Sequence, residues 1–514
     1  MVDLITASEA GKKWGVSKRR VQTYCMEGRI FGATKMGNAW MVPSNAPKPA
    51  DARAMRYKGD YSIPKKPILT SIDLFSGPGG LATGFRWAGI KPLIAVEWSY
   101  WTAQTYAQSH GADILDLEKY LADPSEVERF LLPSKRPVLI YGDINKVEID
   151  LIQKILRERF SVDSVDVVTG GAPCESFSMA GDRKEVDDRN QLYQNVLRIA
   201  RGVDCKLFMF ENVKGLFSKK LNGKAGAMYE AICNEFESKN KSGDPVFRLA
   251  SRDKETVLLK AIDYGVPQAR ERIFLVGLNN KYPELKFSYP QKTNGPESDF
   301  PYVTVADALS DLPYVPVGTE NKKYVFDLST VESGTAKEMF LRRMRGDLSM
   351  PPEHIDFTVE TLTGHKAPGH TKRMLKRFKL IKQGESMKTA SQRLASEGKT
   401  DLIDEFFPKK IYGARNRRLK PNEPSFTVTS HCLDEMIHPT SNRGLSPREA
   451  ARLQSFPDWY LFQGPYVKFH SDPEQDQYEQ IGDAIPPLLA YALAREIIST
   501  LGGSAHMPNN DMCI

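Results

Sequence analysis

Thr70-Ser71-Ile72-Asp73-Leu74-Phe75-Ser76-Gly77-Pro78-Gly79-Gly80-Leu81 is the stretch that decides the fold. Its apolar start predicts a strand, its glycines predict a tight turn, and Leu81 begins a predicted helix. The next apolar segment, 93–96, runs directly into Glu97 and Trp98. An acid at the tip of the second strand suits a ribose diol, and the adjacent indole suits an adenine face. The pattern is typical of an open, doubly wound α/β sheet with its ligand at the carboxyl ends of the strands.

A third apolar segment, 165–168, leads through two glycines to Pro173 and Cys174. A cysteine is more often a buried, inert side chain than a reactive one. Here the glycines and Pro173 predict a constrained turn, which aims the next side chain into a cleft. Cys174 is therefore a candidate reactive thiol.

Charged residues follow two further apolar segments. Residues 208–210 run into Glu211, and Arg270 and Arg272 precede the segment 273–277. Alternate residues of an extended chain share a face, so both guanidiniums can point the same way. The alternative is a solvated strand end at which the arginines pair with Glu271. Together with the thiol, these residues predict one site at the strand ends.

A hydride-transfer enzyme is one alternative, because Gly77, Gly79 and Ala82 satisfy a loose dinucleotide fingerprint. Such an enzyme has no evident use for Pro173-Cys174 or for Glu211-Asn212-Val213. The motifs favour a different chemistry.

In their order along residues 68–500, the motifs resemble the cytosine-C5 DNA methyltransferase family. The resemblance covers Phe75 to Gly80, Glu97-Trp98, Gly142-Asp143-Ile144, Pro173-Cys174, Glu211-Asn212-Val213, Gln268-x-Arg270-x-Arg272, Arg443 to Asp458 and Gln480 to Pro487.

The resemblance implies S-adenosylmethionine as the methyl donor and a chemical role for each motif. Cys174 would add to C6 of cytosine, Glu211 would face N3 and the exocyclic amine, Arg272 would face O2, and Arg270 would supply a positive field for the thiolate. The cofactor would be held by Phe75, Ser76, Gly77, Gly79, Gly80, Leu81, Glu97, Trp98, Asp143, Ile144, Pro173 and Asp483.

Two residues depart from the family pattern. Glu175 replaces the usual Gln after the nucleophile, and Asp483 replaces the usual Asn of the last motif. Each change exchanges an amide for a carboxylate, which removes donors and adds a charge.

A cytosine inside a duplex must be swung out before C6 can be attacked. The charged segment 176–190 follows Cys174, so we expect it to be a mobile lid rather than an ordinary surface loop. Ser178 and Arg189 in or beside this segment are candidate DNA contacts.

Charge is concentrated in one stretch. The chain of 514 residues carries a net charge of +7, whereas Lys366 to Lys420 holds 16 Lys or Arg against 5 Asp or Glu, a balance of +11. The family places its target recognition domain here, so we expect residues 291–423 to bind DNA rather than to be only a solvated face. The candidate phosphate contacts are Lys372, Arg373, Arg415, Arg417 and Arg418.

The first 47 residues predict a separate unit. Thr6 and Ser17 are candidate N-caps of two short helices, and Met36-Gly37-Asn38 predicts a hairpin turn. This pattern resembles a winged helix-turn-helix of the excisionase and MerR type, with Arg19 and Arg20 as candidate DNA contacts. The alternative is a small adaptor that never touches DNA.

We therefore expect residues 1–47 as the winged unit, 48–67 as a Pro-rich linker, 68–290 as catalytic core, 291–423 as recognition domain, 424–502 as the rest of the core and 503–514 as a tail. The helix 488–498 should pack near the first motif.

Composition limits the other possibilities. With 41% hydrophobic residues the chain can build a large core. No secretory pattern and no apolar run of 18 residues are seen, so we expect a cytoplasmic protein, associated with a prokaryotic nucleoid and not with a membrane. The six cysteines lack CxxC spacing, so no metal is expected.

The expected partner is double-stranded DNA, bound by a monomer, with a cognate restriction endonuclease as a candidate second partner. Two rival functions stay open: a tRNA cytosine-C5 methyltransferase, and a DNA-binding regulator with an inactive core.

Overall fold

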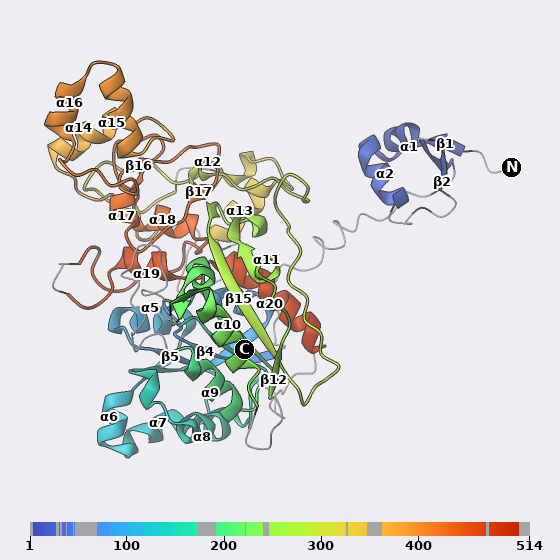
Figure 1. Ribbon diagram of the computed structural model, residues 1–514, viewed down its shortest axis with the longest axis vertical. Helices are drawn as coiled ribbons and strands as arrows, with labels where there is room; N and C mark the ends of the chain where they lie inside the picture. The colour runs from blue at the N-terminus through green and yellow to red at the C-terminus, as the bar shows by residue number, and fades with distance from the viewer. Residues whose placement is uncertain are drawn as a thin grey trace. The chain divides into compact units, whose positions relative to one another are not determined.

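The computed structural model describes residues 4–26, 30, 33–37, 39–44, 46, 69–172, 192–221, 223–239, 246–324, 327–346, 362–468 and 472–502. The chain divides into two compact units, 1–61 and 62–514 (Figure 1). Each unit is described by itself.

The N-terminal unit combines two helices with a small sheet. Thr6 caps the first helix through a capping box with Glu9, and Gly15 ends it in the left-handed conformation. The turn is tight, since a Cβ on Gly11 would lie 2.8 Å from the Val16 carbonyl oxygen. The sequence predicted both helices and the hairpin correctly. The elements are β1 (Leu4–Thr6), α1 (Ala7–Trp14), α2 (Lys18–Met26), β2 (Thr34–Met36) and β3 (Ala39–Pro43), with strand order β1-β3-β2.

The second unit is built on a central sheet with strand order β12-β15-β9-β8-β4-β5-β7-β6, and β13 pairs with β15. The strands from β6 to β9 run parallel, whereas β15 is antiparallel to β9. The strands are β4 (Leu69–Leu74), β5 (Ile90–Glu97), β6 (Asp113–Asp116), β7 (Val138–Tyr141), β8 (Val167–Gly170), β9 (Leu207–Val213), β12 (Phe247–Leu249), β13 (Leu258–Lys260) and β15 (Glu271–Asn279).

The connection order places the predicted ligand site. The chain runs from β4 to β5 and then to the edge strand β6, inserts β7 between β5 and β6, and returns to β8 on the other side of β4. Leu74 pairs with Gly170, so the turn after β4 and the turn after β8 leave the same edge side by side. Open α/β sheets bind ligands at such a switch point.

Helices cover both faces of this sheet, so the central strands β4, β8 and β9 are buried on both sides. On β9, Leu207 and Met209 enter one buried cluster, whereas Phe208 and Phe210 enter the other. Such alternation on a fully buried strand produces a three-layer α/β sandwich. The helices of this core are α4 (Gly80–Ala88), α5 (Tyr100–His110), α6 (Leu117–Ala122), α7 (Glu128–Leu131), α8 (Ile149–Phe160), α9 (Gln194–Gly202), α10 (Ala227–Phe236), α11 (Lys254–Val257), α18 (Pro447–Leu453), α19 (Gln477–Asp483) and α20 (Pro487–Leu501).

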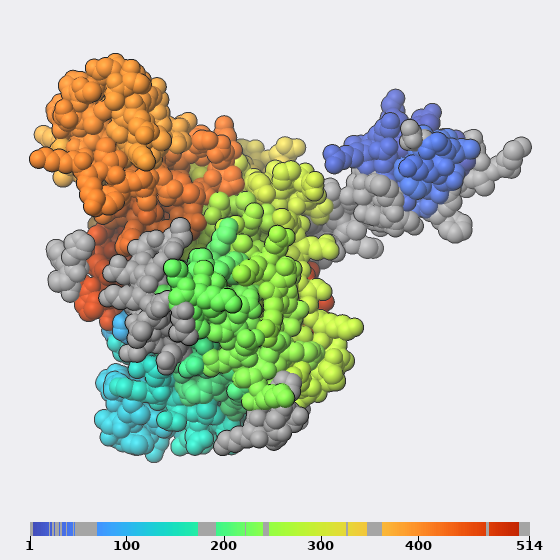
Figure 2. All heavy atoms as spheres, viewed as in Figure 1, coloured from blue at the N-terminus to red at the C-terminus, as the bar shows by residue number. Residues whose placement is uncertain are grey.

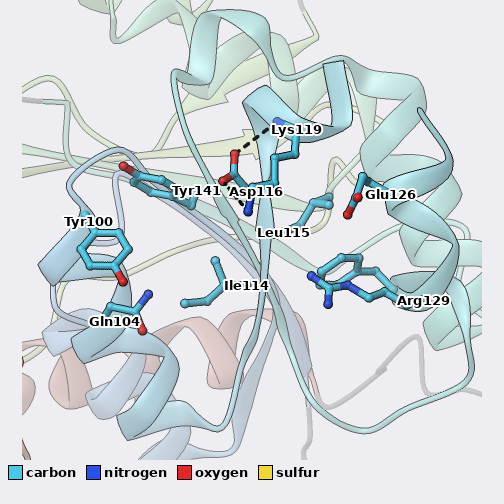
Figure 3. A pocket seen from close by; sticks show the side chains of 10 residues that line it. Tyr100, Gln104, Ile114, Leu115, Asp116, Lys119, Glu126, Arg129 and Tyr141 are labelled. Carbon is cyan, nitrogen blue, oxygen red and sulfur yellow. Dashed lines mark hydrogen bonds and ion pairs between the residues drawn. The ribbon is translucent and has the colours of Figure 1, made fainter. Parts of the chain in front are cut away.

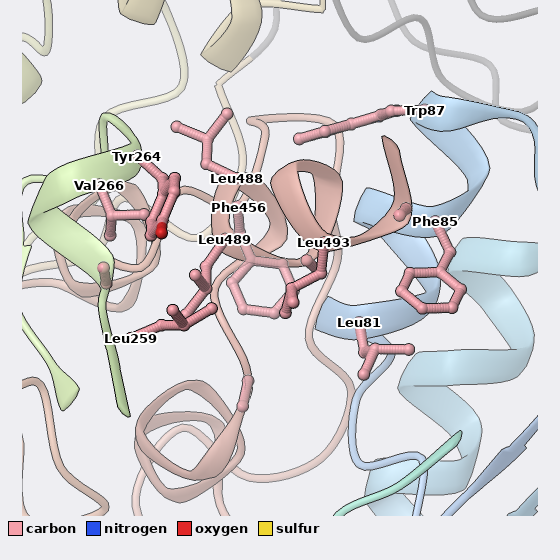
Figure 4. Close-up of a cluster of buried hydrophobic side chains, with 14 of the residues drawn as sticks. Leu81, Phe85, Trp87, Leu259, Tyr264, Val266, Phe456, Leu488, Leu489 and Leu493 are labelled. Atoms are coloured by element: carbon pink, nitrogen blue, oxygen red, sulfur yellow. The ribbon is translucent and has the colours of Figure 1, made fainter. Parts of the chain in front are cut away.

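The last helix, α20, packs against α4, the helix that follows the first motif, as the sequence predicted. A Cβ on Gly84 of α4 would lie 2.3 Å from the Pro487 carbonyl oxygen of α20, so only glycine permits this approach. Leu81 and Phe85 of α4 lie in the same buried cluster as Leu489 and Leu493 of α20 (Figure 4). The C-terminal segment thus backs the glycine-rich turn.

The region expected as recognition domain divides in two. Phe340, Leu341 and Met344 join the main buried cluster, so the part before residue 346 packs on the catalytic core. A separate small cluster, which includes Phe378, Met387 and Leu394, lies under the later helices. Those helices form the orange lobe in Figure 2. The helices of the region are α12 (Val305–Leu309), α13 (Ala336–Met344), α14 (Lys372–Leu380), α15 (Met387–Ser396) and α16 (Thr400–Phe406).

Short elements connect these parts. They are η1 (Pro124–Val127), η2 (Ile144–Lys146), η4 (Lys214–Ser218), η5 (Ala261–Tyr264), η6 (Leu328–Thr330), α17 (Cys432–Glu435), β10 (Lys220–Leu221), β11 (Lys224–Ala225), β14 (Gln268–Ala269), β16 (Arg417–Arg418), β17 (Ser425–Phe426) and β18 (Met436–Ile437). Strand β14 pairs with β17 and β16 with β18, both in parallel.

Among the described residues, one stretch, Gln477–Leu501, is long and apolar enough by composition to span a membrane. It is broken between α19 and α20, and 56% of its most apolar window is buried inside the protein. In this structure it is a core element.

Candidate active site

The glycine-rich turn after β4 packs against the protein at Gly79 and Gly80 but has free space beside Gly77. A Cβ on Gly79 would lie 2.5 Å from the His110 ring, and one on Gly80 would lie 2.2 Å from the Ile485 carbonyl oxygen. A Cβ on Gly77 would meet no described atom within 4 Å. Phe75 has a φ of 53°, a left-handed conformation that a bulky residue adopts only under tertiary constraint. A ligand can approach the backbone at Gly77.

Glu97 ties the second strand to this turn. Its carboxylate accepts hydrogen bonds from the Gly77 N–H at 2.8 Å and from the Ser99 N–H at 3.0 Å. Burial raises the pKa of Glu97, and these backbone donors oppose that rise. Beside it, the Trp98 side chain is 71% exposed. The edge therefore presents a fixed carboxylate next to an open aromatic face.

The third edge element follows β7. Asp143 caps η2 and accepts hydrogen bonds from the backbone and side-chain N–H groups of Asn145, both at 3.0 Å. Its carboxylate is exposed, whereas Ile144 is buried. Ser76 is buried and Leu81 begins the core of α4. The predicted cofactor residues from the first three motifs thus lie at consecutive strand ends of one sheet edge.

A pocket of about 190 Å³ adjoins this edge (Figure 3). Tyr100 and Gln104 of α5 line one side, and Tyr141 precedes the Asp143 turn. Its other lining residues are Ile114, Leu115, Asp116, Lys119, Glu126, Arg129 and Phe130.

Glu211 lies over the strand end that leads to the candidate nucleophile. A Cβ on Gly171 would be 2.8 Å from Glu211 Oε2, so the carboxylate sits against the backbone two residues before Pro173 in the sequence. Arg272 Nε contacts Glu211 Oε1 at 2.9 Å. Burial raises the pKa of Glu211 above its usual value, whereas Arg272 and Arg270 oppose that rise. Glu211 is therefore a buried carboxyl of raised pKa that contacts Arg272 and also feels the positive charge of Arg270.

Arg270 is a buried cation with incomplete partners. It is 1% exposed, and its Nη1 donates to the Val428 carbonyl oxygen at 2.9 Å. Within the described part of the chain, its Nε and Nη2 have no hydrogen-bond partner. Burial lowers its pKa, Arg272 lowers it further, and the carboxylates of Glu211 and Asp483 oppose both. Asp483, one of the departures from the family pattern, thus supplies a negative charge to Arg270.

Several predicted site residues lie outside the described residues. These are Pro173, Cys174, Glu175, Ser178 and Arg189, together with the lid predicted at 176–190.

The candidate phosphate contacts of the recognition region fall into two groups. Lys372 and Arg415 are exposed; Arg373 is also exposed but donates to the Phe407 carbonyl oxygen at 3.1 Å. Arg417 stacks on the Phe426 ring, 3.4 Å from its centroid. Arg418 corrects the prediction: it is 6% exposed and donates five hydrogen bonds to oxygens of the segments 378–381 and 438–442. Its guanidinium is therefore unavailable to phosphate.

The sequence did not predict the hydrogen bonds by which Asp73 and Gln268 support the site. Asp73 is the one ionisable residue of the fully buried strand β4, which was the available signal. It accepts from Thr169 Oγ1 at 2.9 Å, and burial raises its pKa to about 7. Gln268 donates to the Leu453 carbonyl oxygen at 2.9 Å and accepts from the Val428 N–H at 2.9 Å. The hydrophobic periodicity of a sequence does not predict hydrogen bonds between residues so far apart in the chain.

Comparison with known proteins identifies the arrangement. The sequence model of the C-5 cytosine-specific DNA methylases matches residues 69–499. This chain belongs to that family.

Relatives agree with the family match. The Type II methyltransferase M.DdeI of Desulfomicrobium norvegicum is 30% identical over 430 residues, which cover 84% of this chain and 88% of the relative. M.AgeI of Thalassovita gelatinovora is 29% identical over 484 residues, covering 84% and 99%. The predicted activity, cytosine-C5 DNA methylation, is confirmed at the level of the family.

A solved structure shares the fold of this C-5 methylase. It is a candidate DNA modification methyltransferase encoded within an Escherichia coli prophage, with a TM-score of 0.59 and 24% identity, and the alignment covers 84% of this chain and 99% of that one. The doubly wound methyltransferase core predicted from the sequence is thereby confirmed.

Replacing Glu211 by Gln keeps the shape of the side chain but removes its transferable proton. A carboxyl of raised pKa keeps its proton to higher pH than a free carboxyl, and loses it as pH rises through that value. We expect Glu211→Gln to lower the methyl-transfer rate by about 10²–10⁴-fold, as for loss of a general acid. The measurement is single-turnover transfer over a range of pH.

The wild-type rate should fall on the alkaline side as Glu211 ionises, and that fall should be absent in Glu211→Gln. Identical alkaline limbs in the two proteins would show that Glu211 does not supply the proton.

Proposed function

We propose that this C-5 methylase transfers the methyl group of S-adenosylmethionine to C5 of a cytosine swung out of a short specific site in duplex DNA. The observation that carries the proposal is the Glu211–Arg272 pair at Gly171, three residues before Cys174 in the sequence. A flipped pyrimidine placed there would meet a thiol, a carboxyl and a guanidinium together.

The strand-end residues fit the cofactor. Glu97 has spare lone pairs for a ribose diol after accepting its backbone hydrogen bonds, Trp98 offers an open face to adenine, and the open side of Gly77 admits the amino-acid tail. Bound there, S-adenosylmethionine supplies an electrophilic methyl group on sulfur. Asp143 and Ile144 would hold the adenine edge, and Pro173 and Asp483 would close the site.

The protein's own residues would then activate the base. The Cys174 thiolate adds to C6, which moves electron density toward N3 and O2. Glu211 gives its proton to N3, and Arg272 donates to O2. C5 would take the methyl group as the methyl–sulfonium bond breaks and the thioether leaves. A base, such as a water molecule, would then remove the C5 proton, N3 would return its proton to Glu211, and departure of the Cys174 thiolate from C6 would restore the aromatic ring. Arg270, whose Nε and Nη2 have no hydrogen-bond partner among the described residues, would favour the thiolate by its charge.

The names of the relatives suggest the biological setting. M.DdeI and M.AgeI are Type II methyltransferases, so we place this protein in restriction-modification, with a cognate endonuclease as partner. It would act as a monomer on DNA in the cytoplasm of a prokaryotic cell.

The test is bisulfite sequencing of plasmid from a methylation-free host that expresses the protein. Protected cytosines in one short motif are expected. Unprotected DNA from cells holding soluble protein would contradict the proposal; methylated tRNA would then support an RNA substrate, and sequence-specific DNA binding alone would support the regulator.

The N-terminal unit lies outside the family match, and we propose that it contacts DNA separately. Lys12 and Lys13 end α1, whereas Lys18, Arg19 and Arg20 begin α2 after a turn of three residues. The helix dipole favours cations in the last turn of a helix and disfavours them in the first turn. The lysines of α1 lie in its last turn, whereas the cations of α2 lie in its first turn, where they do not stabilise the helix. Such a cluster suits phosphates.

The triple change Lys18→Gln, Arg19→Gln and Arg20→Gln in the full chain should reduce the salt dependence of DNA binding. Each lost phosphate contact lowers the slope of log K against log salt by about 0.9, so a fall of about 2–3 is expected by fluorescence anisotropy. A control with the same charge loss is Lys119→Gln, Lys281→Gln and Lys399→Gln, which removes lysines that already pair with carboxylates. An unchanged slope would make the unit a protein adaptor.

A further inference from the structure

The small lobe of the recognition region carries a row of lysines on α14. Lys372, Lys376 and Lys379 follow one another at helical spacings of four and three, so they share one face, and all three are exposed. No carboxylate among the described residues lies within 4 Å of their ammonium groups. Lysines elsewhere, such as Lys281 and Lys399, do form ion pairs.

The arginines of the same helix are used differently. Arg377 donates to the Phe406 carbonyl oxygen at 2.8 Å and to Asn416 Oδ1 at 3.1 Å. Arg373 reaches the Phe407 carbonyl oxygen. The arginines hold α14 to the rest of the lobe, whereas the lysines leave a row of like charge in solvent. Like charges one turn apart repel, so such a row suits a polyanion that neutralises it.

The row ends at an open hollow of about 560 Å³. Lys379, Lys382 and Gln383 line one side of it, and Thr440 and Asn442 line the other. All five side chains are exposed. The remaining lining residues are Ile381, Arg418 and Pro439.

Arg418 fixes the two sides of the hollow. It donates to the Phe378 and Ile381 carbonyl oxygens behind the first side, at 2.6 and 2.7 Å. It also donates to the His438 and Ser441 carbonyl oxygens and to Asn442 Oδ1 on the second side, at 2.9, 2.8 and 2.8 Å.

Gln383 links the sides once more, because its Nε2 donates to the Pro439 carbonyl oxygen at 3.0 Å. A buried guanidinium with five hydrogen bonds makes the hollow rigid. Recognition of base edges requires polar side chains that are already fixed in position, as Gln383 and Asn442 of this hollow are.

We infer that this hollow reads the target sequence, with Gln383 and Asn442 contacting base edges and the α14 lysines contacting the flanking phosphates. The inference rests on the proposed function, since it assigns specificity to that enzyme. Asparagine and glutamine amides pair with adenine edges in the major groove. Serine and threonine hydroxyls can hydrogen-bond to more than one kind of base edge, and lysines contact phosphate or guanine. Arg418 is a positioning residue that acts through the two walls.

The specificity test compares Asn442→Ala and Gln383→Ala with wild type on duplexes that carry the protected motif or one changed base pair. At one position of the motif, discrimination in kcat/KM should fall about 5- to 150-fold, the equivalent of one bidentate base contact. Gln392→Ala, an exposed glutamine on α15 of the same lobe, is the matched control and should keep the discrimination. A merely structural defect would lower kcat/KM for all the duplexes by the same factor and leave the discrimination unchanged.

The phosphate test is independent of methyl transfer. Lys372→Gln, Lys376→Gln and Lys379→Gln together should lower the salt slope of duplex binding by about 2–3, whereas the triple control at 119, 281 and 399 should not. Unchanged discrimination in both amide variants, or an unchanged salt slope, would overturn the inference. If the wild type protects no cytosine, the proposed function fails, and the salt slope alone decides whether this lobe holds DNA.

Discussion

Cys174→Ala is expected to abolish methyl transfer while the protein still folds and binds duplex DNA. None of the thiols in the described part of the chain can replace it, because Cys25, Cys205, Cys233 and Cys432 are all buried. Burial raises the pKa of the Cys205 and Cys432 thiols well above the usual value and that of Cys233 to about 11. A nucleophile must be a thiolate, which these sites disfavour.

The measurement is transfer of a labelled methyl group to plasmid DNA, combined with bisulfite sequencing and anisotropy of the same samples. Cys432→Ala is the control, since it removes a buried thiol from the core cluster and should keep the methylation pattern. Methylation above background by Cys174→Ala would show that the reaction does not pass through this thiol.

Arg452→Met should be the most destabilising single change in the core. Arg452 is fully buried, with Nη1 at 2.7 Å from Asp311 and Nη2 at 2.6 Å from Asp458, both of which are also buried. Removing the shared cation leaves Asp311 with Arg345 at 2.7 Å, whereas Asp458 keeps only the more distant Arg448, at 3.7 Å. Breaking a buried ion pair on one side costs about 3–5 kcal/mol.

Chemical denaturation of the two proteins measures this difference. Arg157→Met is the comparison, because its pair with Asp163 is exposed and should be worth less than about 1 kcal/mol. Adding Asp458→Asn to Arg452→Met should recover part of the loss, since the second change removes the carboxylate whose remaining arginine is the more distant one. A loss as small as that of Arg157→Met would show that water reaches the Arg452 site.

Local patterns in the sequence predicted the elements that depend on neighbouring residues. The apolar run and glycines of 70–81 specify a strand, a turn and a helix, and the Thr6 and Gly15 caps specify the first helix of the N-terminal unit. Hydrophobic periodicity, turn chemistry and capping act over a few residues, so they are readable without a structure. The order of the motifs then indicated the family and its chemistry.

Tertiary structure decided which charged residues are buried and what they contact. Arg418 and Lys379 belong to the same basic stretch, yet the first is a buried clamp and the second is exposed. Arg452 and Asp311 meet although 141 residues separate them. The cost of burying a charge, and the partners that offset it, depend on which segments fold together. Sequence alone therefore determined the motifs, the strands and the reaction class, whereas only the packing of distant segments decided which cations hold the fold and which face solvent.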